Sequence, residues 1–263
     1  MDAPAGLPER GIGIDAGLTL TKFARVVDGR LHLYAVPTRP DMTAQSPSFE
    51  GVVGVTGARA AMLATPGAHA AQEIEAAARG VRALALRTGE FCVALLGTGT
   101  AFAAVRQGAV AHLGGCALGG GSFYAIGRAI NTRVSYQALV AAAARGDRRN
   151  ADLMVSDAYP EGIGRISADL TAAHLAKPGA SFDDFIAALL NLHGESIAQI
   201  AAQRARLQGL DTMVLCGGFV HQNEALVRSI AAMCALFGVR AELCPQPGFA
   251  GAVGALALAG SSS

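Results

Sequence analysis

The sequence predicts an α/β protein made of two similar units, each a β-meander accompanied by helices, with a central cleft between the units. The first observation is that a strand, a glycine turn and a second strand occur at residues 11–27 and again at residues 93–105. The second is that a segment with helical spacing of apolar residues comes later in each half. A further strand, at residues 213–216, also runs into glycines. We expect one unit in residues 1–90 and the other in residues 91–263.

The composition is typical of a compact α/β protein. Of the 263 residues, 52% are hydrophobic and 16% are charged, and the formal net charge is +1. Without a long basic run, nucleic acid is not an expected partner. The 5 cysteines lack CxxC spacing, which indicates reduced thiols. The N-terminus has no signal-like apolar core and no run of about 18 apolar residues occurs, so we expect a cytoplasmic protein with no membrane partner.

The first meander carries polar groups at its first turn. A strand ends at Asp15-Ala16-Gly17, and a second strand follows at residues 19–27 and includes Lys22. Asp28-Gly29 then predicts a hairpin before a strand at residues 30–36. Asp15, at the tip of a buried strand, is suited to hold Mg²⁺. The alternative is that Asp15 is an Asx-turn residue with a structural role only.

Two carboxylates lie at the start of the first expected helix. The segment AAQEIEAAARGVRALALR has helical spacing from about Ala70 onwards, and Glu73 and Glu75 lie in its first turn. One account is that both complement the helix dipole. The other is that one of them points into the cleft as a general base, and the pattern of residues leaves both accounts open.

The glycine-rich stretch from Val93 to Gly127 is the part around which we expect the chain to be organised. A strand leads into Gly97-Thr98-Gly99-Thr100, where uncovered N–H groups and two hydroxyls suit an anion. Two more strands, at residues 101–105 and 110–113, precede Gly114-Gly115. Gly119-Gly120-Gly121 then precedes a helix expected from about Ser122, and these glycines should offer free N–H groups. The alternative is that the glycines only make hairpin turns.

The rest of the chain is expected to be mainly helical. His193 is expected on the surface of the longest helix, and Arg145, Arg148 and Arg149 at a solvated helix end. The expected elements are helices at residues 136–145, 182–208, 223–237 and 250–259, a helix beginning within 166–177, and strands at 51–57, 213–216 and 239–243.

Glycine turns after similar strands in both halves, with a third at residue 217, are the arrangement of an ATP-using fold with duplicated meanders. The chain resembles the type II pantothenate kinases of the acetate and sugar kinase, Hsc70 and actin superfamily. The segments that carry the resemblance cover nearly the whole chain: GIDAGLTLTK, LLGTGTAF, HLGGCALGGGSFYAIGRAI, AARGDRRNADLMVSDAYP, ISADLTAAHLAK, LCGGFVHQNEALVR and GFAGAVGALAL. The resemblance implies the actin-like ATPase (ribonuclease H-like) fold. It also implies phosphorylation of pantothenate by ATP, the entry to coenzyme A.

The resemblance further implies which residues form the site. Glu73 falls at the family's catalytic glutamate, and Asp15 is implied to bind Mg²⁺. The implied pantothenate-binding residues are His112, Gly114 and Gly115. The implied ATP-binding residues are Gly17, Thr19, Lys22, Gly97, Thr98, Gly99, Thr100, Gly119, Gly120, Gly121, Gly217, Gly218 and Phe219. A homodimer, built partly on helices near residues 182–208, is implied as well.

Two positions depart from the family's pattern. Leu18 stands at a phosphate turn where the family usually has glycine, and His112 stands where it has an arginine suited to the carboxylate of pantothenate. Arg106 and Arg128 are candidates to compensate. Three alternatives therefore stay open: a nucleotide-binding sensor of the same fold with weak or lost catalysis, a kinase for another hydroxyl substrate, and an ATPase activator with an iron–sulfur cluster between subunits.

Overall fold

The structure contains two five-stranded sheets with the same internal order. It is a computed structural model that describes residues 1–39, 51–63, 66–164 and 166–261. The first sheet has the order β3-β2-β1-β4-β5, with β1 (Gly11–Ala16), β2 (Leu20–Val27), β3 (Arg30–Pro37), β4 (Val52–Thr56) and β5 (His69–Ala70). The second has the order β12-β11-β6-β7-β8, with β6 (Phe91–Leu96), β7 (Thr100–Arg106), β8 (Ala109–Cys116), β11 (Thr212–Cys216) and β12 (Arg240–Leu243).

The two sheets are built by the same rule. In each, the first three strands pair antiparallel as a meander, and two later strands are added in parallel beside the first of them. The turn at Asp28-Gly29 has φ values of 50° and 70°, the left-handed pair that a two-residue hairpin turn of this kind requires. The repeated topology confirms the predicted α/β fold with duplicated β-meander units.

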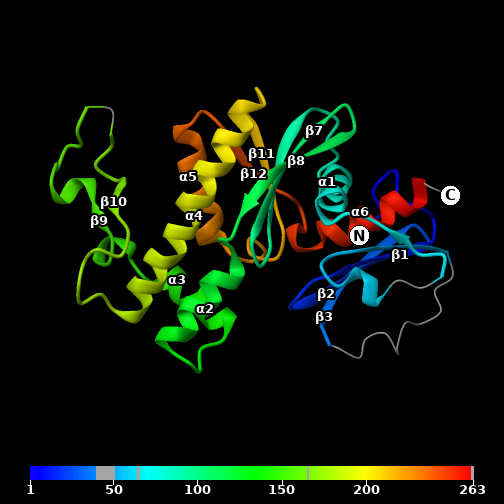
Figure 1. The fold of residues 1–263 in the computed structure, drawn as a ribbon, viewed down its shortest axis with the longest axis horizontal. Helices are drawn as coiled ribbons and strands as arrows, with labels where there is room; N and C mark the ends of the chain where they lie inside the picture. Colours follow the sequence, from blue (N-terminus) through cyan, green and yellow to red (C-terminus); the bar gives the residue numbers. More distant parts are fainter. Residues whose placement is uncertain (40–50, 64–65, 165, 262–263) are drawn as a thin grey trace.

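Helices cover both faces of the second sheet (Figure 1). On one face, α4 (Phe182–Leu207) and α5 (Glu224–Leu236) share a core with the strands, joined by α2 (Gly120–Ile130) and α3 (Tyr136–Arg145). On the other face, α1 (Glu73–Leu84) packs on β6, β7 and β11. Helix α6 (Ala250–Ser261) packs on α1 and on β1 and β4. The helices α1 and α6 therefore lie between the two sheets.

Helix α4 is long and apolar enough to cross a membrane, judged by length and composition. However, 72% of its most apolar window is buried inside the fold. It packs against α2, α3, α5 and the second sheet, which is how the central helix of a globular core is packed.

Helix α6 approaches its neighbours so closely that no side chain fits at the contacts. A Cβ on Gly13 of β1 would lie 1.9 Å from the carbonyl oxygen of Ala252. A Cβ on Gly254 would lie 1.6 Å from the carbonyl oxygen of Ala76 in α1. Glycine is required here because backbone meets backbone. The C-terminal helix therefore packs directly on the first sheet. The expected boundary between two units, after residue 90, stays a prediction.

Three expected helix positions differ from the structure. Helix α1 begins at Glu73 rather than near Ala70, because His69 and Ala70 pair with β4. Helix α2 begins at Gly120, two residues before Ser122. Within residues 166–177 no helix begins in the described part; Thr171–Ala173 is instead a strand, β10, paired with β9 (Leu153–Met154). At residues 69–70 and 171–173, the backbone N–H and C=O groups form hydrogen bonds with another strand instead of the helical hydrogen bonds that we expected.

The expectation that His193 lies on the surface of the long helix is wrong. Its exposed fraction is 0%, and its ring contacts the rings of Phe123 and Phe219 edge-on. Because α4 is covered by the second sheet and by α2, α3 and α5, the middle of this helix has little surface to offer.

Replacing Gly254 by alanine should destabilise the fold by about 1–3 kcal/mol, the usual cost of forcing a carbon atom into a packed contact. The neighbouring atom is a backbone carbonyl, which moves only if α6 moves. Chemical denaturation measures the change. Gly89→Ala is the matched control, because a Cβ there meets no atom within 4 Å. Equal stability of the two variants would contradict the close approach of α6 and α1.

Candidate active site

Asp15, at the end of β1, has a buried carboxylate with one unsatisfied oxygen. It lies opposite Lys22 of β2, and Lys22 Nζ donates to Asp15 Oδ2 at 3.0 Å. Asp15 is only 7% exposed, and its Oδ1 has no hydrogen-bond partner among the described residues. Backbone closes around the carboxylate, since a Cβ on Gly57 would lie 2.7 Å from Oδ1 and one on Gly251 2.9 Å from Oδ2. A buried carboxylate oxygen without a partner is suited to a cation or an ordered water.

Glu73, the first residue of α1, lies within electrostatic reach of Asp15 and Lys22. Its side chain is accessible to solvent, but the surrounding protein reduces its hydration and raises its pKa. The Asp15 carboxylate raises the pKa of Glu73 further, and Lys22 lowers it. Glu75 lies about 200° further around the helix and points elsewhere. The structure thus brings Glu73, Asp15 and Lys22 together, and their roles stay predictions.

The first turn, Gly17-Leu18-Thr19, presents unpaired backbone donors. The N–H groups of Leu18 and Thr19 make no hydrogen bond to any described residue, while Thr38 Oγ1 donates to the carbonyl oxygen of Gly17 at 2.9 Å. Leu18 is 52% exposed and has no positive φ. The backbone at this turn therefore does not require the glycine that the family usually has, and the leucine side chain points outward.

The second turn, between β6 and β7, has the same character. The N–H groups of Thr98 and Gly99 are without a hydrogen-bond partner in the described part of the chain. Thr100 Oγ1 donates to the carbonyl oxygen of Leu118 at 2.8 Å, so this hydroxyl is already used. A Cβ on Gly97 would meet no atom closer than 3.8 Å, which leaves open space beside the turn. Unpaired N–H groups facing open space are suited to phosphate oxygens.

The three glycines before Ser122 do not offer free N–H groups, and that expectation is wrong. The N–H of Gly119 donates to Ser122 Oγ at 3.1 Å. The N–H of Gly120 donates to the carbonyl oxygen of Gly97 at 2.9 Å, and that of Gly121 to the carbonyl oxygen of Thr98 at 3.0 Å. The N-terminus of α2 therefore supports the second turn, and direct contact of these glycines with ATP stays a prediction.

The third turn, Gly217-Gly218-Phe219, follows β11 and touches the end of β6. Gly217 has φ of 104°, and a Cβ on it would lie 2.3 Å from the carbonyl oxygen of Leu96. Phe219 is buried and its N–H donates to that same oxygen at 2.9 Å. A Cβ on Gly218 would meet no atom within 4 Å. Since β6 and β11 are parallel neighbours, this turn and the second turn leave the same edge of the sheet.

The predicted substrate residues lie on the edge strand β8. His112 is exposed and faces Ala103 in the register with β7. Gly114 has φ of 91°, and a Cβ on Gly115 would lie 2.3 Å from the carbonyl oxygen of Thr100, so both glycines serve the strand itself. Binding of substrate by these three residues stays a prediction.

The arginines considered as substitutes for the missing one already have other contacts. Arg106 pairs with Glu90 at 2.7 Å, and Arg128 lies over the ring of Tyr124 at 5.7 Å. Arg204 of α4 lies close to the segment, with one guanidinium nitrogen 3.8 Å from the position of a Cβ on Gly114. No local spacing in the sequence connects Arg204 with that segment.

Two sheets of the same strand order, with unpaired N–H groups at the turns, place the chain in the structural class of the actin-like ATPase fold. Solved structures of that class are similar in fold. An activator of 2-hydroxyisocaproyl-CoA dehydratase from Clostridium difficile, with bound ADPNP, has a TM-score of 0.66 at 18% identity, covering 96% of this chain and 95% of that one. A ROK hexokinase from Thermus thermophilus has a TM-score of 0.62 at 15% identity, covering 96% and 98%.

The sequence comparisons are more specific. The sequence model named Fumble matches residues 91–258. A curated type II pantothenate kinase from Oceanobacillus iheyensis is 30% identical, covering 93% of this chain and 98% of its own. The chain therefore belongs to the Fumble family, and the predicted resemblance to type II pantothenate kinases is confirmed.

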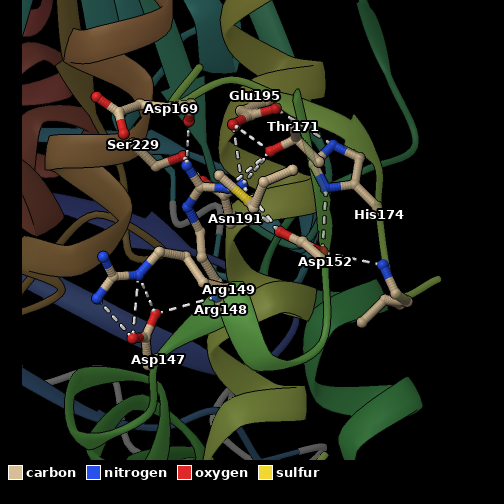
Figure 2. Close-up of polar contacts among 12 residues, drawn as sticks. Asp147, Arg148, Arg149, Asp152, Asp169, Thr171, His174, Asn191, Glu195 and Ser229 are labelled. Carbon is tan, nitrogen blue, oxygen red and sulfur yellow. Dashed lines mark hydrogen bonds and ion pairs between the residues drawn. The ribbon is translucent and has the colours of Figure 1, made fainter. Parts of the chain in front are cut away.

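A second group of charged residues lies away from the three turns and holds the described residues of 147–177 against α4 (Figure 2). Asp152 is fully buried, and its Oδ1 accepts from the N–H of Leu175 at 2.9 Å. Arg148 Nη1 lies 3.5 Å from Asp152 Oδ2 and donates to Thr171 Oγ1 at 2.7 Å. The loop segment that carries β9 and β10 is thus attached to the core by buried polar contacts rather than by apolar packing alone.

Two of the three arginines expected at a solvated helix end lie on the surface, and the third does not. Arg145 pairs with Asp183, and Arg149 with Asp147, both at 2.7 Å on the surface. The expectation of a solvated helix end is wrong for Arg148, which points into the buried group (Figure 2). Asp152 is only four residues away, but Thr171, which accepts from Arg148, is 23 residues away, and the spacing of the arginines did not reveal that contact.

His174 bridges the two carboxylates of this group (Figure 2). Its Nε2 lies 3.3 Å from Glu195 Oε2, and its Nδ1 lies 3.6 Å from Asp152 Oδ1, an ion-pair distance. Asp152, and then Glu195, raise the pKa of His174 to about 9, against the smaller opposing effect of burial. The imidazolium and Arg148 together balance the two carboxylates, which a buried group of charges requires.

The pKa of His174 predicts how stability depends on pH. The pKa is about 9 in the folded state and about 6.5 when unfolded, so the contribution is complete below the lower value and is lost as pH rises through the higher one. Discounted for partial exposure to water, it amounts to about 1–3 kcal/mol. Denaturation curves of wild type and His174→Gln should therefore differ most near pH 6 and converge towards pH 10. A difference independent of pH would contradict the assignment.

Proposed function

We propose that the protein transfers the γ-phosphoryl group of ATP to pantothenate and forms 4′-phosphopantothenate, the first step of coenzyme A biosynthesis. The observation that carries the proposal is Glu73, a carboxylate with a raised pKa beside the Asp15–Lys22 pair. It occurs in a chain of the same family as a curated type II pantothenate kinase. Pantothenate is proposed as the substrate because the relative is named a pantothenate kinase. Phosphoryl transfer is supported by the arrangement of Glu73, Asp15 and Lys22.

We assign the proton transfer to Glu73. The oxygen of the primary hydroxyl of pantothenate attacks the γ-phosphorus, ADP leaves, and the hydroxyl proton passes to a base. Because the surrounding protein and Asp15 raise the pKa of Glu73, its carboxylate holds a proton more tightly than an ordinary glutamate. That property suits a general base acting on an alcohol.

We assign the phosphates to the turn donors. The unpaired N–H groups of Thr98 and Gly99, and of Leu18 and Thr19, are available for phosphate oxygens. Lys22 adds positive charge near them. The third turn, with room beside Gly218, supports a place for the adenosine.

The residues around Asp15 fit a magnesium ion. The buried Oδ1 without a partner is a hard oxygen donor of the kind this ion prefers. When bound, Mg²⁺ neutralises charge on the phosphates. Asp15 would hold it, and Lys22 keeps the other carboxylate oxygen in place.

We also propose that the protein is a cytoplasmic homodimer, with helices near α4 contributing to the interface, and with neither nucleic acid nor a membrane as partner. The support is the resemblance to the family. Light scattering by the purified protein measures the mass that decides between monomer and dimer.

His112 favours a second candidate function, a kinase for a related alcohol that lacks a carboxylate. An imidazole offers a carboxylate a single donor at a time, whereas a guanidinium makes a bidentate and permanently charged contact. The two candidates share the same site chemistry and differ only in the end of the substrate that is not phosphorylated.

Glu73→Gln should lower kcat by about 10²–10⁴-fold, because the amide has no useful affinity for the hydroxyl proton. ATP affinity, measured by calorimetry, should stay close to that of the wild type. Glu75→Gln is the matched control, since it removes the same charge from the same helical turn and should retain most activity. If Glu75→Gln were the inactive variant, the base would be misassigned.

His112→Arg should lower KM for pantothenate by about tenfold, because a carboxylate gains a permanent, bidentate partner worth about 1.4 kcal/mol. Pantetheine, which has no carboxylate, is the control substrate, and its KM should not change. Steady-state kinetics with both substrates makes the comparison. The same change for both substrates, or for neither, would show that His112 does not face the carboxylate.

A further inference from the structure

The buried His193 has a single tautomer in this structure. Its Nδ1 lies 2.9 Å from the carbonyl oxygen of Leu189, and a carbonyl only accepts, so Nδ1 carries the proton. Burial lowers the pKa of His193, against a smaller opposite effect of that same hydrogen bond. The ring is therefore neutral, and Nε2 is an acceptor.

This tautomer determines the direction of the next hydrogen bond. Ser122 Oγ lies 2.9 Å from His193 Nε2, so the hydroxyl donates to the ring. Its oxygen is then free to accept the N–H of Gly119 at 3.1 Å. The same hydroxyl also lies 3.1 Å from the carbonyl oxygen of Gly119, and without His193 it would turn towards that oxygen.

The effect of this contact extends to the second turn. Gly119 begins the run whose next two N–H groups hold the carbonyl oxygens of Gly97 and Thr98. The spacing there allows no side chain, since a Cβ on Gly119 would lie 2.6 Å from the carbonyl oxygen of Thr98. The carbonyl of Gly97 and the N–H of Thr98 belong to one planar peptide group and point in opposite directions, as do the carbonyl of Thr98 and the N–H of Gly99. Because α2 binds both carbonyl oxygens, the two N–H groups point away from α2.

We propose that His193 is a positioning residue for ATP: through Ser122 and the N-terminus of α2, it holds the second turn in the shape that receives the phosphates. The inference rests on the proposed function and names a residue that touches neither substrate. His193 also contacts Phe219 of the third turn, so one buried ring supports two of the three turns.

The test compares Ser122→Ala, Ser122→Thr and His193→Phe in the full chain. Ser122→Ala removes the hydroxyl, Ser122→Thr keeps it, and His193→Phe keeps an aromatic ring but removes both nitrogens. The alanine and phenylalanine variants should raise KM for MgATP about tenfold, corresponding to about 1.4 kcal/mol. KM for pantothenate should stay unchanged, and the threonine variant should resemble the wild type.

A matched control separates positioning from stability. Ser135 Oγ accepts the N–H of Ala138 at 3.1 Å at the start of α3, the same kind of contact away from the turns. Ser135→Ala should lower Tm to a similar extent as Ser122→Ala without changing KM for MgATP. Equal rises in both KM values for Ser122→Ala, or no rise in either, would overturn the proposal.

Direct binding distinguishes a failure of this inference from a failure of the proposed function. Calorimetry with ADPNP and Mg²⁺ reports nucleotide affinity whether or not pantothenate is phosphorylated. An inactive wild type whose Ser122→Ala variant binds ADPNP about tenfold more weakly would reject the kinase and retain the positioning role. An active wild type that binds ADPNP as tightly as its Ser122→Ala variant does would retain the kinase and reject the positioning role.

Discussion

The backbone contact between α6 and its neighbours is the constraint on which the site depends. Gly13 of β1 and Gly254 of α6 leave no room for a side chain, and the same is true of Gly80 of α1, where a Cβ would lie 1.8 Å from the carbonyl oxygen of Ala250. The end of α6 that makes these contacts also carries Gly251, whose Cβ would lie 2.9 Å from Asp15 Oδ2. The packing of α6 therefore connects the two sheets and completes the backbone that surrounds the buried carboxylate of Asp15.

The two units repeat one topology but support their turns differently. At the first turn, the side chain of Thr38 holds the carbonyl oxygen of Gly17. At the second, the backbone at the N-terminus of α2 holds the carbonyl oxygens, and His193 reaches it through Ser122. In both cases the carbonyl side of the turn is bound by protein and the N–H side is left unpaired. Such a division suits an anion, because donors point outward without competing acceptors.

Local patterns predicted the strands of the two five-stranded sheets except β5, the hairpin at Asp28-Gly29 and the bounds of α3, because alternation, turn residues and helical spacing are properties of neighbouring residues. They offered Asp15, the glycine turns and both Glu73 and Glu75 as candidates for the same reason, and only the family resemblance preferred Glu73. The buried state of His193, the inward direction of Arg148 and the strand β10 were missed, since each depends on partners far away in the chain. The N–H groups of Gly120 and Gly121 were wrongly expected to be free because their acceptors lie in another turn.

We propose above all that the carboxylate of Glu73 acts on the hydroxyl of pantothenate beside bound ATP. The most direct measurement is ADP release by the purified wild-type protein with MgATP, in the presence and absence of pantothenate. If Glu73 acts in this way, ADP release depends on pantothenate and is matched by an equal amount of 4′-phosphopantothenate. ADP release at the same rate without pantothenate, or tight ATP binding with no release, would contradict it.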